Sequence, residues 1–157
     1  MRAELGYAVR RALRIPIAVR PGNDNRPVSD NSQMTTGLPS QQNRRVLIVD
    51  DEPGLLDAMT LAFERAGRNV VGCRTFEEAR EKLLTEEFQC LITDVRLGAF
   101  NGIQLAVIAR DRNQDLSIIV FSGFDDPVLR EEATHVGATY LVKPVTVEHL
   151  LELVDAG

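Results

Sequence analysis

Three carboxylates, one hydroxyl and one amine each follow a short apolar run in this sequence. In chain order, these groups belong to Asp50, Asp51, Asp94, Ser122 and Lys143. An apolar run of three to five residues is typical of a buried strand, so each group would leave the core where a strand ends. Groups that leave a parallel sheet at the same end can meet, and we expect these five to converge.

Such a cluster favours metal-assisted phosphoryl chemistry. Three carboxylates repel one another, and a divalent cation relieves the repulsion. Oxygen ligands with room for water suit Mg²⁺ better than Zn²⁺, and neither Cys nor His belongs to the cluster. The adjacent Asp50 and Asp51 are the expected metal pair, whereas the single Asp94 is the expected nucleophile toward phosphorus. Lys143 and Ser122 would then stabilise the phosphoryl oxygens.

Strand and helix patterns alternate along the chain and would position these groups. The five predicted strands are residues 46–49, 70–71, 90–94, 116–121 and 139–142. The five predicted helices begin beside Pro53, Thr75, Ile103, Pro127 and Thr146. Thr75 followed by Glu78 has the pattern of a capping box, and residues 95–102 are predicted to form a loop.

This alternation predicts an α/β fold, a doubly wound five-stranded parallel sheet with helices on both faces. Right-handed crossovers leave few strand orders. In the flavodoxin-like order 2-1-3-4-5, a ligand binds beyond the carboxyl ends of strands 1 and 3. Those ends carry Asp50, Asp51 and Asp94, and Ser122 and Lys143 follow the next two strands. The expected fold therefore gathers the chemical groups at one edge of the sheet.

The composition fits one globular domain with extra N-terminal sequence. Of the 157 residues, 44% are hydrophobic, and no apolar stretch reaches the roughly 20 residues of a membrane span. Cys73 and Cys90 lie in or beside predicted strands, so we expect buried free thiols in a reducing cytoplasm. Residues 46–157 hold 10 basic and 20 acidic side chains, a net charge of −10. This acidity argues against direct binding of nucleic acid.

Residues 1–43 are predicted to be a disordered basic N-terminal extension and linker. Residues 21–43 are rich in Asn, Ser, Gln, Gly and Pro, which is typical of a linker. Near the start, the pattern indicates a short basic amphipathic helix, with apolar residues at helical spacing and several arginines. Pro16 would end that helix. That segment could contact an anionic membrane or a partner. The alternatives are a mobile tail, or sequence translated upstream of a start at Met34.

Five motifs stand in order over residues 45–157. They are Asp50-Asp51-Glu52-Pro53, Thr93-Asp94-Val95-Arg96-Leu97, Gly102, Ser122-Gly123 and Lys143-Pro144. Together they resemble the receiver domain of two-component response regulators. The resemblance covers the whole predicted α/β domain, so we expect a receiver (CheY-like) domain at residues 44–157, of the stand-alone single-domain type.

The resemblance implies a phosphoacceptor and a metal site. Asp94 would accept a phosphoryl group from a sensor histidine kinase or a phosphotransfer protein. Asp51, Asp94 and the backbone carbonyl of Arg96 would bind Mg²⁺, and Asp50 would assist through water.

It also implies a switch. Lys143 would pair with the phosphoryl group, and Ser122 would move toward it. Tyr140 stands where the family has an aromatic residue that turns inward, although a packing role in its strand fits it equally well. The Lys143–Pro144 peptide would be cis, as is usual in this family.

Two features depart from the family pattern. Gly98 stands where members usually have Pro, which we expect to loosen the loop after Asp94 and leave the pocket intact. Arg96 and Phe124 stand two residues beyond Asp94 and Ser122, at positions that influence attack by water. We hypothesise that this long cation and apolar ring slow the loss of the phosphoryl group.

The sequence therefore predicts a phosphorylation-controlled switch and not an enzyme. Its signal would leave through the surface of the fourth helix, fifth strand and fifth helix, to a downstream protein or within a homodimer. One rival is a phosphatase or phosphotransferase with an aspartyl intermediate, but Arg96 replaces the acid that such hydrolases have two residues after the nucleophile. The other rival is a pseudo-receiver that only binds partners.

Overall fold

Five parallel strands form the central sheet of the computed structural model, which describes residues 44–157. The strands are β1 (Arg45–Val49), β2 (Asn69–Cys73), β3 (Cys90–Asp94), β6 (Ser117–Ser122) and β7 (Thr139–Val142). They lie in the order β2-β1-β3-β6-β7, which confirms the predicted flavodoxin-like order. Since the strands pair in parallel, their carboxyl ends share one edge. The predictions for residues 1–43 lie outside the described residues.

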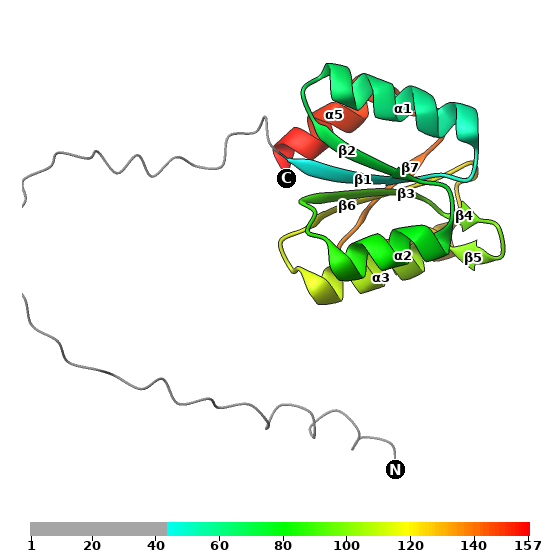
Figure 1. Cartoon of the computed structure of the whole chain (residues 1–157). Helices are drawn as coiled ribbons and strands as arrows, with labels where there is room; N and C mark the ends of the chain where they lie inside the picture. Colours follow the sequence, from blue (N-terminus) through cyan, green and yellow to red (C-terminus); the bar gives the residue numbers. More distant parts are fainter. Residues whose placement is uncertain (1–43) are drawn as a thin grey trace, which may run out of the picture. The chain divides into compact units, whose positions relative to one another are not determined.

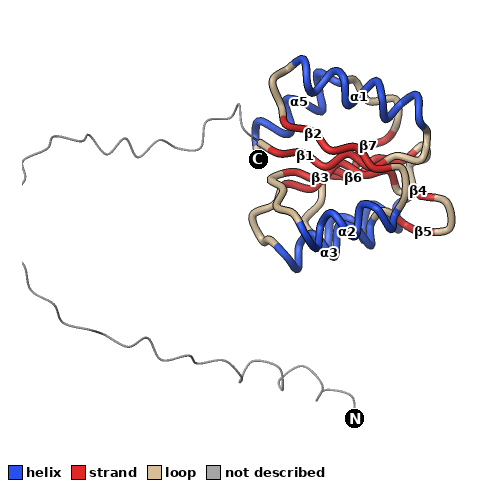
Figure 2. Tube along the Cα trace, viewed as in Figure 1, coloured by secondary structure: helices blue, strands red, loops and turns tan. Residues whose placement is uncertain are grey.

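Helices cover both faces of this sheet, as predicted (Figures 1 and 2). The helices are α1 (Pro53–Arg65), α2 (Phe76–Thr85), α3 (Ile103–Arg112), α4 (Pro127–His135) and α5 (Val147–Ala156). Buried side chains of α1 and α5 pack on one face, and those of α2, α3 and α4 pack on the other. Within residues 44–157, no helix is long and apolar enough to cross a membrane.

The central strands are buried on both faces, which explains their unbroken apolar runs. Each residue of β3 is buried, including Asp94 at its end. Cys73 and Cys90 are buried free cysteines, as predicted. Burial raises the pKa of the Cys73 thiol to about 11 and that of the Cys90 thiol to about 12, which keeps both thiols protonated and unreactive.

The predicted cap of α2 at Thr75 is confirmed with one difference, and Asp126 caps α4 directly before Pro127. The Thr75 hydroxyl accepts a hydrogen bond from the backbone N–H of Glu78 at 3.2 Å. The Asp126 carboxylate accepts one from the N–H of Val128 at 2.9 Å. The Glu78 carboxylate, however, accepts from the N–H of Arg74 and not from that of Thr75, so the capping box forms only half of its pattern.

The segment after β3 is more regular than the predicted loop. It contains two short antiparallel strands, β4 (Arg96–Leu97) and β5 (Phe100–Asn101), which we call the β4–β5 ribbon. Gly98 and Ala99 form its turn, and Gly98 has a φ of +61°. A positive φ at the first position of a two-residue turn suits glycine. The prediction missed the ribbon because strands of two residues have no readable alternation.

Candidate functional site

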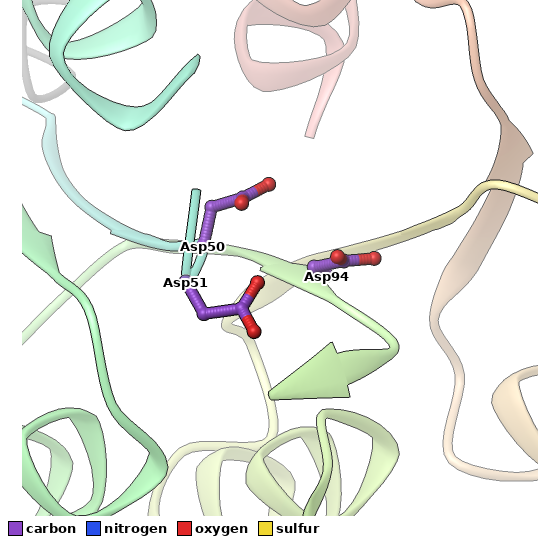
Figure 3. A group of neighbouring side chains, drawn as sticks. All are labelled: Asp50, Asp51 and Asp94. Atoms are coloured by element: carbon purple, nitrogen blue, oxygen red, sulfur yellow. The ribbon is translucent and has the colours of Figure 1, made fainter. Parts of the chain in front are cut away.

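The carboxylates of Asp50, Asp51 and Asp94 lie together at the carboxyl edge of the sheet (Figure 3). β1 pairs with β3 in a register that puts Val49 beside Thr93. The residues that follow these two, Asp50 and Asp94, are therefore neighbours too. One carboxylate oxygen from each of the three residues lies within 4.8 Å of the others. The predicted convergence of distant acids is therefore present in the fold.

Asp50 and Asp51 occupy different environments although they are adjacent. Asp50 is fully buried, and its two oxygens accept hydrogen bonds from the N–H of Glu52 at 2.8 Å and from the ammonium of Lys143 at 3.3 Å. Asp51 is exposed, and its Oδ2 accepts a long hydrogen bond of 3.4 Å from the N–H of Gly98. Asp51 is thus the more accessible of the two for a direct metal bond.

Asp94 is buried beside like and unlike charges. Burial raises the pKa of its carboxyl above the ordinary value, and the nearby Asp50 charge raises it further. The charge of Lys143, whose Nζ lies 3.3 Å from Asp94 Oδ2, opposes this rise, as does a backbone hydrogen bond from Arg96. Burial and the Asp50 charge thus disfavour the charged form of this carboxyl in the metal-free protein, and a cation at the site would oppose that effect.

The charges of the site leave room for a cation. Lys143 contacts Asp50 and Asp94 at 3.3 Å each, and its Nζ lies 4.7 Å from the centre of the Phe121 ring. One ammonium compensates only part of the charge of three carboxylates. Because the donor set is all oxygen, it fits a hard divalent cation.

The comparisons with known proteins agree with this geometry. Residues 46–155 match the response regulator receiver domain family. The chain belongs to that family. It is 30% identical over 112 residues to the response regulator protein PilR of Pseudomonas aeruginosa, covering 71% of this chain and 25% of PilR. It is 31% identical over 113 residues to the response regulator receiver protein CpdR of Brucella abortus, covering 71% of this chain and 92% of CpdR.

A solved receiver structure is also similar. It is a response regulator protein from Burkholderia pseudomallei with a phosphorylated aspartic acid, a calcium ion and citrate. The TM-score is 0.67 at 28% identity, over 71% of this chain and 66% of that one. The chain spans between 24% and 49% of the length of seven curated relatives, which are longer proteins.

Two further predicted site residues lie on neighbouring strands of the receiver domain. Ser122, at the end of β6, is buried, and its Oγ accepts a hydrogen bond from the N–H of Phe124 at 3.2 Å. As an acceptor in that bond, the hydroxyl keeps its hydrogen to donate elsewhere. Tyr140, on β7, is also buried, and its hydroxyl donates to the carbonyl of Phe124 at 2.9 Å. Both side chains therefore contact the loop between β6 and α4, and their switch roles stay predictions.

The receiver domain also uses residues whose contacts the sequence did not reveal. A Cβ atom added to Gly102 would lie 1.9 Å from the carbonyl oxygen of Asp94. The buried Thr93 hydroxyl donates to that same carbonyl oxygen at 3.0 Å. Gly102 was part of the motif, but such close packing of two backbones has no sequence pattern of its own. Together these two contacts fix the backbone of Asp94.

Arg96 and Phe124 meet, although they follow different strands. The Arg96 guanidinium lies 5.0 Å from the centre of the Phe124 ring, which is 64% exposed. The contact joins the segment after β3 to the loop after β6, and these two segments flank Asp94 and Ser122. The Lys143–Pro144 peptide is cis, as predicted. The Arg96 carbonyl stays a predicted metal ligand.

Proposed function

We propose that this receiver domain accepts a phosphoryl group on Asp94 and signals in the phosphorylated form through protein contact. The donor would be a sensor histidine kinase or a phosphotransfer protein. The observation that carries the proposal is the meeting of Asp94, Asp51, Asp50 and Lys143 at one edge of the sheet. The phosphorylated aspartic acid in the similar Burkholderia pseudomallei structure supports it.

The residues of the site suit one transfer step. An oxygen of Asp94 would form a bond to phosphorus while the bond from phosphorus to the donor's imidazole nitrogen breaks, and the imidazole leaves with its electron pair. Lys143, 3.3 Å from Asp94, would hold an equatorial oxygen of the phosphoryl group. The Ser122 hydroxyl would donate to another once it leaves its place beside Phe124.

We propose Mg²⁺ as the cation of this site. Asp51, Asp94 and the backbone carbonyl of Arg96 would hold it, and Asp50 would act through water. This division follows from burial, because Asp50 is already hydrogen-bonded to Glu52 and Lys143 whereas Asp51 is exposed. When bound, the ion would neutralise charge on the phosphoryl oxygens.

We propose a switch and not an enzyme for small substrates. Arg96 would not serve as the general acid or base that an aspartyl phosphatase needs at that position. Phosphorylation would shift the surface of α4, β7 and α5, where Tyr140 contacts the β6–α4 loop, toward a form that binds a downstream protein. A homodimer through the same surface is the alternative. The free thiols of Cys73 and Cys90 support a reducing compartment, and we propose the cytoplasm.

Intact-mass measurement after incubation with acetyl phosphate and Mg²⁺ tests the proposal. We expect one phosphoryl adduct on the wild-type chain and none on Asp94→Ala. Asp115→Ala is the matched control, since Asp115 is exposed and lies before β6, far along the chain from Asp94. A wild-type chain that neither binds Mg²⁺ nor takes up phosphoryl would favour the pseudo-receiver instead.

A further inference from the structure

The β4–β5 ribbon carries two groups that face the metal site. The N–H of Gly98, in its turn, donates to Asp51 at 3.4 Å, and the backbone N–H of Arg96 bonds to Asp94. The ribbon pairs only Arg96 with Asn101 and Leu97 with Phe100. A two-stranded ribbon of this size is not stable alone, so other contacts must hold it.

The base of the ribbon is held by hydrogen bonds between neighbouring residues of the chain. The N–H of Gly102 donates to the carbonyl of Val95 at 2.8 Å, and the Asn101 side chain accepts from the N–H of Ile103 at 2.8 Å. These bonds lie at the base of the ribbon, next to β3 and α3. The turn itself has only the long 3.4 Å hydrogen bond from the N–H of Gly98 to Asp51.

An aromatic pair anchors the end of the ribbon that lies next to the turn. The ring of Phe100 stacks on the ring of Phe76, the first residue of α2, with centroids 4.6 Å apart and planes 13° from parallel. Phe100 lies opposite Leu97, so both side chains are on one face of the ribbon. Leu97 is buried in the core cluster that also contains residues of α2 and α3. Yet Phe100 is 42% exposed, more than a residue that serves the core alone.

We propose that the Phe76–Phe100 pair is a positioning device that holds the β4–β5 ribbon in the geometry needed for metal binding. This inference rests on the proposed function. α2 is fixed by its cap at Thr75 and by the buried Ala79 and Leu83. Through the stacked rings, this fixed helix sets the place of the turn at Gly98 and of the Arg96 backbone. Phe76 and Phe100 touch no reacting atom and act through the ribbon.

Mg²⁺ titration of the full chain without a phosphodonor tests this role. Phe100→Ala is expected to bind Mg²⁺ about three- to tenfold more weakly, the range that corresponds to the loss of one aromatic pair. Phe76→Ala should have the same effect, and the double variant should be no worse than either single one, because both remove the same contact. Phe100→Tyr keeps the ring and should restore the wild-type affinity.

Leu84→Ala is the matched control, since Leu84 is a 39% exposed apolar residue on the same helix as Phe76. It should leave Mg²⁺ affinity unchanged. Hydrogen exchange of the metal-free protein gives a second readout, and the Gly98 amide should exchange faster in Phe100→Ala than in Leu84→Ala. Equal Mg²⁺ affinity and equal Gly98 exchange in these two variants would overturn the positioning role while leaving the proposed function intact. A wild-type chain without Mg²⁺-dependent labelling at Asp94 would instead contradict the proposed function.

Discussion

Asp94 has an environment that opposes its own charge. Burial and the charge of Asp50 raise the pKa of its carboxyl above the usual 3.8. When folding raises the pKa of an acid, the folded state holds the proton more tightly than the unfolded state does. The resulting contribution to the free energy of unfolding is fully present below the ordinary pKa, and it is lost as the pH rises through the raised pKa. The charged Asp94 therefore costs the metal-free domain stability at neutral pH.

We accordingly expect Asp94→Asn to raise the melting temperature of the metal-free protein at pH 7, because the amide has no charge to desolvate. The gain should shrink as pH falls toward the ordinary pKa of 3.8. Thermal denaturation at several pH values measures this, with Asp115→Asn as the control. A melting temperature for Asp94→Asn that is equal to or below that of the wild type at pH 7 would refute the assigned environment.

The Arg96–Phe124 contact bears on how long the phosphoryl group persists. The guanidinium and the ring, 5.0 Å apart, join the two segments that flank the site. We expect them to hinder the approach of water, so that unaided hydrolysis takes far longer than seconds and becomes faster in Phe124→Ala. The time course of intact mass after removal of the phosphodonor checks this. Loss within seconds from the wild type would reject the hypothesis.

At the scale of elements, the close contact between the start of α3 and the end of β3 requires glycine. A Cβ on residue 102 would lie 1.9 Å from the Asp94 carbonyl oxygen, so Gly102→Ala must shift backbone. We expect a loss of about 1–3 kcal/mol in the free energy of unfolding, as is usual for overpacking, together with slower phosphorylation. Denaturant unfolding measures the first effect.

Gly54→Ala is the control for that substitution, because Gly54 lies in α1 and a Cβ added there would have nothing within 4 Å. Alanine there should stabilise the helix by up to about 1 kcal/mol. If Gly102→Ala were as stable as Gly54→Ala, the close contact would not be a real constraint.

The sequence predicted the elements that have a repeating pattern and missed those that depend on contacts. Apolar runs identified the strands of the main sheet, and the cap at Thr75 identified the start of α2. The apolar spacing of α1 favoured Leu55 for the buried face of the helix, but Leu56 is the buried leucine and Leu55 is only partly buried, because the sheet fixes the rotation of the helix. The β4–β5 ribbon was missed because strands of two residues show no alternation in the sequence. The ribbon depends instead on contacts with the core and on the Phe76–Phe100 pair.

The same limit applies to the site. Order and spacing were enough to predict that Asp50, Asp51, Asp94 and Lys143 converge, since strand ends of a parallel sheet share an edge. They were not enough to predict that Arg96 would contact Phe124, because this contact depends on side-chain directions in two segments.

At the scale of the whole molecule, metal binding should be visible as stability. A cation that binds only the folded domain stabilises it, by about 2.7 kcal/mol at a concentration 100 times the dissociation constant. We expect Mg²⁺ to raise the melting temperature of the wild type and to have little effect on Asp51→Asn. Asp57→Asn is the control, because Asp57 is an exposed carboxylate on α1. If Mg²⁺ raises the melting temperature of Asp57→Asn as much as that of the wild type, the smaller rise in Asp51→Asn is specific to the site. An equal rise in Asp51→Asn would exclude Asp51 as a ligand.

The most direct test of the account is to locate the phosphoryl group by peptide mass mapping after labelling with acetyl phosphate and Mg²⁺. We predict that the peptide containing Asp94 carries it in the wild type and in Asp115→Ala, and that no peptide carries it in Asp94→Ala. A label on a peptide without Asp94, or one that persists in Asp94→Ala, would contradict the central claim that this buried carboxylate is the acceptor.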